Sequence, residues 1–294
     1  MIITLLQQQL EERPTAERSI TKLGEAVGLS RSTVRRNLRK PCSESGGEKD
    51  IELRDQIQQV ALEMRSYGHR TITKELRRRG TIANKKRVLR LMREDNLLCL
   101  RRRAFVRTTD SNHSLTVYPN LAKTMELSNI NQLWVADITY IRLVREFIYL
   151  AVIMDAYSRR CIGWAISRFI DTELTLCALR MAIDQRAVQP GLVHHSDRGV
   201  QYASTEYVSL LLANRITISM SRTGNPYDNA KAERFIRTLK YEEIYMNDYE
   251  TMIEVRASIS NFIEAVYNRK RLHSAIGYLP PAEFEASLSP QILS

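Results

Sequence analysis

The sequence lacks the features that mark a membrane, secreted or zinc-binding protein. The longest apolar runs among its 294 residues, such as FIYLAVIM, are far shorter than the roughly 20 residues of a membrane-spanning helix. The N-terminus has neither a basic region nor a small-residue cleavage site, so it does not read as a signal peptide. The four cysteines are scattered and form no C-x-x-C pair, which argues against a zinc ribbon and a disulfide framework. We therefore expect a cytoplasmic protein.

The excess of basic over acidic residues is confined to the first third of the chain. The formal net charge is +11; residues 1–110 contain 25 Lys and Arg against 14 Asp and Glu, whereas residues 111–294 contain 19 of each. A basic region joined to a neutral one is typical of a protein that binds a polyanion, most simply nucleic acid, because phosphate neutralisation releases counterions. A basic surface that only keeps the protein soluble is the alternative interpretation.

Residues 1–42 have the pattern of a helix-turn-helix domain. Within AERSITKLGEAVGLSRSTVRRNLRK, an apolar-periodic helix runs to Gly28, where a turn favours a residue free to adopt positive φ. Ser30 is suited to cap a second helix, in which Val34 and Leu38 would face inward. The outward side chains are suited to base edges and phosphates: Arg31, Ser32, Thr33, Arg35 and Arg36. Any small helical hairpin would share the pattern, but the arginines favour DNA binding.

A second helical unit is expected at residues 51–103. A linker at 43–50 precedes it, because Pro, Ser and Gly indicate coil there, and a basic linker at 104–129 follows it. Amphipathic segments would bury Leu76, Val88, Leu89 and Met92. The basic side chains that we expect to contact DNA are Arg77, Arg78, Lys85, Lys86, Arg101, Arg102 and Arg103. The unit is either a second helix-turn-helix or a solvated helical bundle.

From residue 130 the hydrophobic period changes from helix-like to strand-like. QLWVADITYIRLV, EFIYLAVIMDAYS and RCIGWAISR are rich in β-branched and aromatic residues, which indicates three successive strands. Helical patterns then alternate with two further strand-like segments, GLVHHSD and ITISMS. This order predicts an α/β domain over residues 130–250, with a mixed five-stranded sheet flanked by helices. A C-terminal helix and tail are expected at 251–294.

Three acids lie at places where an α/β domain commonly builds a site. Asp137 is inside the first strand, where a carboxylate is expensive to bury unless it is paired or binds a cation. Asp197 follows a strand at its carboxyl end. Glu233 is on the last helix of the α/β domain, whose apolar face fixes its direction. Taken singly, each could be a solvent-facing residue, a turn former or a helical ion-pair partner, but their joint occurrence in this order indicates a site.

Polar side chains accompany Glu233 on its helix. Asn229, Glu233, Arg237 and Lys240 follow one another at i, i+4, i+8 and i+11 and form one stripe. We expect Asn229, Arg237 and Lys240 to position DNA. Three carboxylates without a Cys or His ligand pattern suit hard, oxygen-preferring cations, Mg²⁺ or Mn²⁺. A cation would explain why a carboxylate stands on a surface suited to phosphates, because without it the acid would repel DNA.

Several segments carry a resemblance to a known family. WVADITYI, DAYSRRCIGW, HSDRGVQYAS, SMSRTGNPYDNAKAERFIRTLK and YNRKRLHSAIGYLPPAEFE, in this order, resemble the DDE transposases of bacterial insertion sequences, specifically the IS-three group. These enzymes resemble retroviral integrases in their ribonuclease-H-like core. The match runs from about residue 51 to residue 287 and includes YGHRTITKELRRRG. The 35 residues between Asp197 and Glu233 match the family's characteristic spacing, so the resemblance assigns the family's triad to Asp137, Asp197 and Glu233.

The resemblance implies a nucleoid-associated bacterial enzyme that binds the ends of its element, cleaves them to expose 3′-hydroxyls and joins these to target DNA. Two ions, Mg²⁺ or Mn²⁺, would act in each active site; Asp137 would bridge both, and Asp197 and Glu233 would hold one each. Pairing two DNA ends implies a homodimer or a higher oligomer. In many members the helix-turn-helix comes from a separate upstream reading frame, whereas here such a segment precedes the core in the same chain.

Other function classes are weighed against this one. A non-catalytic DNA-binding regulator derived from a transposase would be signalled by loss of an acid, and none is lost. A plain metal-dependent nuclease would not need the basic first third. A tyrosine recombinase would need an Arg-His-Arg cluster and a late tyrosine that the pattern does not supply. His194 and His195 adjoin Asp197, but histidines at a strand end more often pack or hydrogen-bond than catalyse.

Overall fold

The structure, a computed structural model, describes residues 44–97, 116–221 and 229–288. The chain divides into two compact units, Met1–Asp55 and Gln56–Ser294. The expected helix-turn-helix of residues 1–42 lies outside the described residues, with its Arg31, Ser32, Thr33, Arg35 and Arg36, and so do Arg101, Arg102 and Arg103. Within the described ranges, no helix is long and apolar enough to cross a membrane.

The second helical unit consists of α4 (Glu44–Glu63), α5 (His69–Arg78) and α6 (Lys85–Glu94). The linker expected at 43–50 is wrong for residues 44–50, which are the first residues of α4. Gly46 and Gly47 favoured coil, since a glycine inside a helix costs roughly 1 kcal/mol. Extending an existing helix by one residue requires much less than nucleating one, and the amphipathic segment that follows supplies the helix to extend.

The α4–α6 core is close to the one expected. Leu76, Val88 and Met92 are fully buried, as predicted, but Leu89 is half-buried and Leu91 takes its place inside. Val88, Leu91 and Met92 stand at i, i+3 and i+4, so they share one helical face. The Asn84 side chain accepts a 2.8 Å bond from the Lys86 amide and caps α6.

Five strands form one mixed sheet, as predicted: β1 (Leu133–Arg142), β2 (Phe147–Asp155), β3 (Cys161–Ser167), β4 (Val193–Ser196) and β5 (Thr217–Met220). Their order is β3-β2-β1-β4-β5. β2 runs antiparallel to β1 and β3, whereas β1, β4 and β5 are mutually parallel. This is the ribonuclease-H-like sheet that the resemblance implied.

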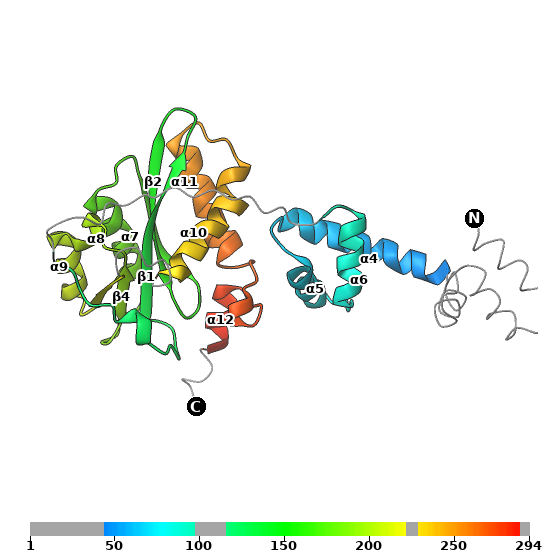
Figure 1. The fold of residues 1–294 in the computed structure, drawn as a ribbon, viewed down its shortest axis with the longest axis horizontal. Helices are drawn as coiled ribbons and strands as arrows, with labels where there is room; N and C mark the ends of the chain where they lie inside the picture. The colour runs from blue at the N-terminus through cyan, green and yellow to red at the C-terminus, as the bar shows by residue number, and fades with distance from the viewer. Residues whose placement is uncertain (1–43, 98–115, 222–228, 289–294) are drawn as a thin grey trace, which may run out of the picture. The chain divides into compact units, whose positions relative to one another are not determined.

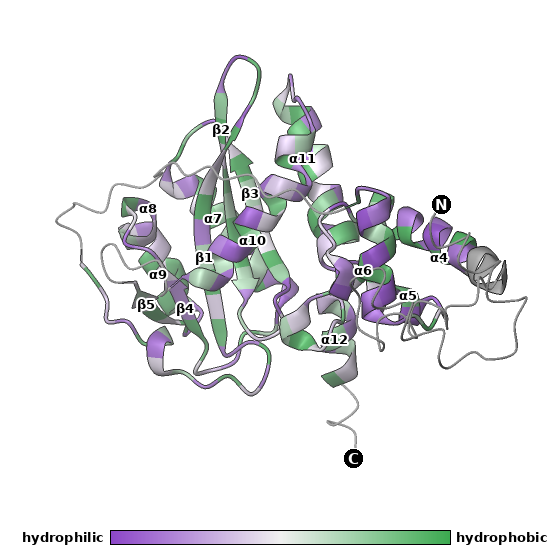
Figure 2. Cartoon of the chain, turned by 45° about the vertical axis from the view of Figure 1, so that its right-hand side comes forward, coloured by the Kyte–Doolittle hydropathy of each residue, from purple (hydrophilic) through white to green (hydrophobic). Residues whose placement is uncertain are grey.

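Helices cover both faces of the sheet (Figure 1). On one face, α7 (Thr172–Gln185), α8 (Val200–Ala203) and α9 (Thr205–Ala213) pack over a core that includes Trp134 and Leu179. On the other face, α10 (Ala230–Glu242) and α11 (Met252–Asn261) pack over a core that includes Val135 and Phe235. The strands between these helices are predominantly hydrophobic (Figure 2). The sheet is therefore the middle of three layers.

The C-terminal tail is more structured than the sequence indicated. α11 continues into a π-helical turn, Phe262–Tyr267, and the Pro-containing tail forms α12 (Pro281–Leu288). Single turns of 3-10 helix occur at Ala122–Thr124, Ile244–Met246 and Ser274–Ile276. On α12, Glu285 is buried. Its carboxylate accepts bonds from Ser158 and Arg160, so the tail is joined to the turn between β2 and β3.

Gly163 on β3 allows α7 to approach the sheet closely. A Cβ at this position would stand 2.3 Å from the Ala178 carbonyl oxygen and 2.9 Å from the Ala182 Cβ. We expect Gly163→Ala to lower the free energy of unfolding by about 1–3 kcal/mol, because the helix must move to admit a methyl group. The midpoint of urea unfolding measures this loss. Gly68→Ala is the control: its Cβ would meet nothing within 4 Å, and an unchanged midpoint in both variants would contradict the packing argument.

Candidate active site

Asp137 stands in the middle of β1, on the face that α10 covers. It shares this face with Leu133 and Val135, because alternate residues of a strand point the same way. Its side chain is half-buried, and one carboxylate oxygen accepts a 2.9 Å bond from the Ile138 amide. The strand thus holds a carboxylate at the edge of an otherwise apolar interface.

Asp197 lies beside Asp137 in the sheet register. β4 pairs in parallel with β1, with Val135 opposite His195. Continuing this register by two residues on each strand brings Asp197, which directly follows β4, level with Asp137, and neighbouring strands are about 4.8 Å apart. The Asp197 carboxylate also accepts a 2.9 Å bond from the Gly199 amide. The register therefore brings the two acids level at the end of β4, and the charge of Asp197 acts on Asp137.

Glu233 reaches the same region from α10. The helix packs through Ala232, Phe235, Ile236 and Leu239, which leaves Glu233 half-buried at the margin of its apolar face. The side-chain amide of Asn229, one turn earlier, donates a 2.9 Å bond to the Ala136 carbonyl. The start of α10 is therefore anchored to the residue that precedes Asp137.

Asn229 does not occupy the place that we expected for it. It is only 6% exposed, so it lies beneath the surface where a DNA contact would form. Its amide nitrogen is bonded to Ala136, and its Oδ1 is buried with no hydrogen-bond partner among the described residues. The role indicated by these contacts is to position the helix, because the bond links α10 to β1.

The charges of Asp197 and Glu233 act on Asp137. Burial, then the charge of Asp197 and to a smaller degree that of Glu233, raise the pKa of Asp137 well above its ordinary value; the Ile138 amide and Lys240 oppose this. Burial also raises the pKa of Glu233, against the charge of Arg237. Carboxylates that cannot easily be charged together provide a place for a cation, which would relieve their repulsion.

The three carboxylates are chemically suited to bind a hard cation. Carboxylate oxygens are the ligands that Mg²⁺ and Mn²⁺ prefer, and the unpartnered Oδ1 of Asn229 is a further oxygen nearby. Within the part of the chain that the structure describes, however, no group of three His, Cys, Asp or Glu side chains is close enough to hold one metal ion. The assignment of Asp137, Asp197 and Glu233 as a complete ligand set therefore stays a prediction.

Basic side chains on α10 stand near the acids. The Lys240 ammonium lies 4.3 Å from the centre of the Tyr140 ring, a cation–π contact. Its charge acts on Asp137, while its own half-burial lowers its pKa. Arg237 is exposed on the same helix. Both are placed where a phosphate bound at the acids would meet a positive charge.

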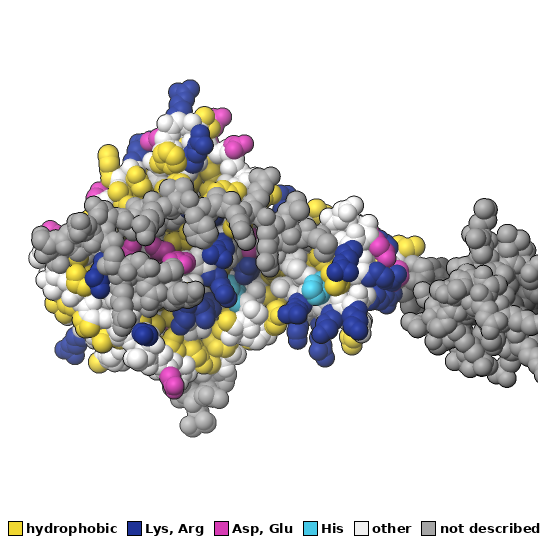
Figure 3. Space-filling model, in the orientation of Figure 1, with side chains coloured by type: hydrophobic (Ala, Val, Ile, Leu, Met, Phe, Trp, Pro, Cys, Tyr) yellow, Lys and Arg dark blue, Asp and Glu magenta, His cyan; other side chains and the backbone are white. Residues whose placement is uncertain are grey.

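The basic residues expected on the helical unit differ in their availability. Arg77, Lys85 and Lys86 are exposed, and Figure 3 shows many Lys and Arg side chains over α4–α6. Arg78 instead forms a two-bond ion pair with Glu283, at 3.0 and 2.6 Å. Its guanidinium is therefore engaged within the protein, which argues against the DNA contact predicted for it.

Both histidines beside Asp197 are buried and hydrogen-bonded to hydroxyl groups of the protein core. His195 is fully buried, with its two ring nitrogens 2.8 and 2.9 Å from the hydroxyls of Ser219 and Ser221. His194 bonds the Tyr207 hydroxyl at 2.9 Å, and burial lowers its pKa to about 3. A neutral, packed histidine is poorly suited to transfer a proton at the surface.

The sequence reasoning missed Tyr202 on α8. It is buried, and its hydroxyl has no hydrogen-bond partner among the described residues. Burial raises its pKa most, followed by the neighbouring Tyr207 and then by the charges of Asp197 and Asp137. A tyrosine five residues after Asp197, in HSDRGVQYAS, was the available signal. Its hydroxyl lies near enough to the two acids to sense their charge.

Comparison with known proteins gives consistent matches along the chain. Residues 128–226 and 214–281 match integrase core domains, and residues 48–105 match an HTH-like domain. The insertion element IS600 uncharacterized 31 kDa protein of Shigella sonnei is 40% identical over 220 residues, which are 74% of this chain and 81% of that protein. The transposase InsF for insertion sequence IS3A of Escherichia coli (strain K12) is 38% identical over 220 residues, 74% of this chain and 76% of that protein.

Two solved structures of retroviral integration proteins match part of the chain at low identity. A chain of the simian T-cell lymphotropic virus intasome, in complex with PP2A regulatory subunit B56 gamma, is 15% identical with a TM-score of 0.45, and covers 78% of this chain and 74% of its own length. The catalytic core domain of BIV integrase is 23% identical with a TM-score of 0.42, and covers 56% of this chain and 99% of its own length.

Proposed function

The chain belongs to the IS3 family of insertion-sequence transposases, and from that premise we propose that it cleaves DNA at the ends of its element and joins the exposed 3′-hydroxyls to target DNA. The observation that carries the proposal is the parallel register of β1 and β4, which, continued to the end of β4, brings Asp137 level with Asp197, on the sheet face that is covered by the helix bearing Glu233. The charge of Asp197 raises the pKa of Asp137, and a bound divalent cation would relieve this repulsion.

Asp137, Asp197 and Glu233 are the residues that would hold the divalent cations, two Mg²⁺ or Mn²⁺ ions per site. When bound, such ions make an attacking hydroxyl more acidic and stabilise the departing 3′-oxygen. The chain's own contribution is position and charge. The parallel register of β1 and β4 would place Asp137 level with Asp197, and the Asn229–Ala136 bond holds the start of α10 against β1.

The basic side chains would bind the DNA on either side of this chemistry. Arg237 is exposed, and Lys240 lies beside Tyr140, so both are available to phosphates of the strand that is cut. Arg77, Lys85 and Lys86 on the helical unit would bind the duplex ends. Because two element ends must be brought together, the active form would be a homodimer or a higher oligomer on DNA.

A cleavage and joining assay tests the proposal. Labelled duplex DNA carrying the element's ends is incubated with the full chain in Mg²⁺, Mn²⁺, Ca²⁺ or EDTA, and products are separated on denaturing gels. We expect nicking at the ends and joining to target DNA with Mg²⁺ or Mn²⁺ only. Cutting without joining would favour a nuclease, and binding without cutting under every metal would favour a regulator; either outcome contradicts the proposal.

Asn229 offers a second test of the site's assembly. We expect Asn229→Ala to lower the rate of metal-dependent cleavage by roughly 10–100-fold, the range for residues that orient metal ligands, because α10 loses its bond to Ala136. DNA affinity measured in Ca²⁺ should be unchanged, since the side chain is buried. Asn247→Ala, at an exposed position after α10, is the control. A loss of DNA affinity equal to the loss of rate would restore Asn229 as a DNA contact.

A further inference from the structure

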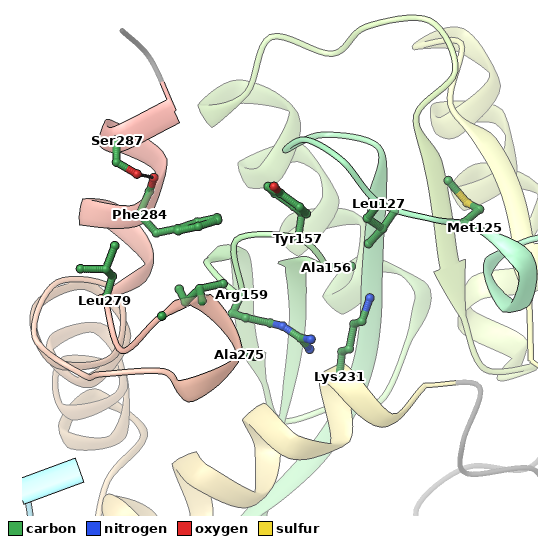
Figure 4. A pocket seen from close by; sticks show the side chains of 12 residues that line it. Met125, Leu127, Ala156, Tyr157, Arg159, Lys231, Ala275, Leu279, Phe284 and Ser287 are labelled. Atoms are coloured by element: carbon green, nitrogen blue, oxygen red, sulfur yellow. Dashed lines mark hydrogen bonds between the residues drawn. The ribbon is translucent and has the colours of Figure 1, made fainter. Parts of the chain in front are cut away.

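A cavity of about 660 Å³ lies apart from the three acids, none of which lines it. Its walls come from the turn after β2, the first turn of α10 and the segment from residue 275 to α12. Arg159 and Lys231 extend their charged ends into the same part of it (Figure 4). Its volume is within the range of about 300–1,000 Å³ that is typical of small-ligand sites.

Arg159 is held in an unfavourable backbone conformation at this cavity. Its φ is +67°, in the left-handed region that glycine and asparagine tolerate best. Its side chain is half-buried, and its Nε is buried without a hydrogen-bond partner among the described residues. Strained backbone and a buried Nε without a partner in one residue point to a function that the fold alone does not supply.

The two cations of the cavity have no ion-pair partner among the residues that the structure describes. The carboxylate of Asp155 acts on both, but it is fully buried and accepts backbone bonds from Asn131, Tyr157 and Ser158. Arg160, the next residue along the chain, differs from Arg159 in this respect, because its guanidinium pairs with the Glu285 carboxylate at 2.7 Å.

The electrostatics around Arg159 favour the binding of an anion. Burial, and then the charge of Arg234, hold the pKa of its guanidinium below the ordinary value, although Tyr267 and Asp155 act in the opposite direction. An anion in the cavity would reverse the effect of burial by giving the guanidinium a partner. Arginine presents several donors in a planar fork that matches phosphate oxygens.

The remaining wall of the cavity is apolar and partly aromatic. The rings of Tyr157 and Phe284 lie 5.5 Å apart between centroids, and Leu127 and Leu279 line the cavity beside them. Figure 4 shows Phe284 directed toward Tyr157 on the side away from Lys231. The cavity therefore combines two cations at one end with a surface on which a flat, apolar group can stack.

We propose that this cavity binds one unpaired nucleotide of DNA, with its phosphate between Arg159 and Lys231 and its base against Tyr157 and Phe284. Cations for the backbone and aromatic rings for the base are the means by which proteins hold single strands. A base within a duplex is stacked and cannot enter a cavity without leaving the helix. The identity of the ligand rests on the proposed action on DNA, whereas the site itself rests on the cavity.

Binding of a fluorescent single-stranded oligonucleotide to the full chain, in Ca²⁺ so that no cleavage occurs, tests the proposal. We expect Arg159→Gly and Lys231→Ala each to weaken single-strand binding about tenfold, close to the lower end of the range for a hydrogen bond to a charged group, and to change duplex binding less than twofold. Arg159→Gly should fold normally, because glycine suits a positive φ. Arg145→Gly, which removes an exposed cation from another turn, should have no effect. Equal losses for single strand and duplex, or no loss, would overturn the proposal.

Two further probes identify the ligand chemistry. Thymidine monophosphate should compete with the oligonucleotide far better than inorganic phosphate does, and Phe284→Ala should remove that difference; equal competition would mean a simple phosphate site and would overturn the nucleotide assignment. An oligonucleotide carrying 5-iododeoxyuridine should crosslink to Tyr157 or Phe284, and crosslinks only elsewhere would count against the site. Weakened single-strand binding by Arg159→Gly in a protein that cuts under no metal would retain the cavity's role and reject the proposed catalysis.

Discussion

Asp137→Asn is expected to abolish metal-dependent DNA cleavage and, in the absence of divalent metal, to make the protein more resistant to unfolding. Loss of residues that merely orient metal ligands costs 10–100-fold in activity. Asp137 would be an inner ligand, so its replacement should cost at least roughly 100-fold. The amide retains the shape of the carboxylate, so the bond from Ile138 can persist and the loss is one of charge.

The gain in stability follows from the direction of the pKa shift. Burial and Asp197 raise the pKa of Asp137 well above the ordinary 3.8, so the folded state retains a proton that the unfolded state releases. Stability therefore falls as the pH rises from about 3.8 through the folded pKa. At neutral pH the wild-type protein bears this penalty in full if its folded pKa lies below neutrality, and in part if it lies above. Asparagine has no proton to lose and escapes it.

Thermal unfolding in EDTA and in Mg²⁺, at several pH values, measures both effects together. The wild type should gain stability on adding Mg²⁺, because a ligand that binds only the folded state stabilises it, whereas Asp137→Asn should gain little. Asp184→Asn, at an exposed position on α7, is the control and should behave as the wild type. An Asp137→Asn protein that unfolds earlier than the wild type in EDTA would contradict the electrostatic argument, and one that still cuts DNA would contradict the site.

The sheet and its acids could be predicted because their signals are local. Runs of β-branched and aromatic residues marked β1, β2 and β3 within a few residues of their ends. Asp137 was conspicuous as a charge inside such a run, and Asp197 as an acid directly after a strand. The parallel pairing of β1 with β4 then brings the two together, which a mixed sheet makes plausible but a single sequence does not specify.

Asn229 was misplaced because helical periodicity fails at a helix end. The i, i+4 relation to Glu233 put both residues on one stripe, but α10 begins at Ala230 and Asn229 is its N-cap, with non-helical backbone angles. Its side chain therefore points toward β1, where it bonds the Ala136 carbonyl, rather than outward. Arg78 illustrates another difficulty, since its ion-pair partner Glu283 is 205 residues away in the sequence. A run of basic residues suggests a DNA-binding surface, but it cannot show which of its arginines pair with an acid far away in the sequence.

Glu285→Ala is expected to lower the free energy of unfolding by about 3–5 kcal/mol, the range for removal of one member of a buried ion pair. The Glu285 carboxylate accepts bonds from Ser158 Oγ at 2.6 Å, Arg160 Nη1 at 2.7 Å and Arg186 Nη2 at 2.6 Å. The Glu285 and Arg186 side chains are each only 9% exposed. The Glu285→Ala substitution would therefore leave the buried guanidinium of Arg186 without its carboxylate partner. It would also remove the bonds that link α12 to the β2–β3 turn.

The same carboxylate makes stability depend on pH in the opposite direction to Asp137. Burial pushes the pKa of Glu285 upward, but Arg186, and then Ser158 and Arg160, outweigh it and hold the pKa below the ordinary 4.5. The stabilisation is therefore complete above about pH 4.5 and is lost as the pH falls through the folded pKa. Glu285→Gln, which keeps the shape and removes the charge, should show a weaker dependence on pH in this acidic range than the wild type.

Urea unfolding of Glu285→Ala, Glu285→Gln and Glu283→Gln separates burial from charge. Glu283 lies on the same helix and pairs with Arg78, but its side chain is 47% exposed, and exposed ion pairs contribute about 0–1 kcal/mol. If Glu285→Gln and Glu283→Gln lowered the free energy of unfolding equally, the effect would belong to α12 as a whole rather than to the buried carboxylate. A large loss of unfolding free energy confined to the variants at position 285 would mean that the Glu285 carboxylate holds α12 to the β2–β3 turn. No local sequence pattern predicts this contact.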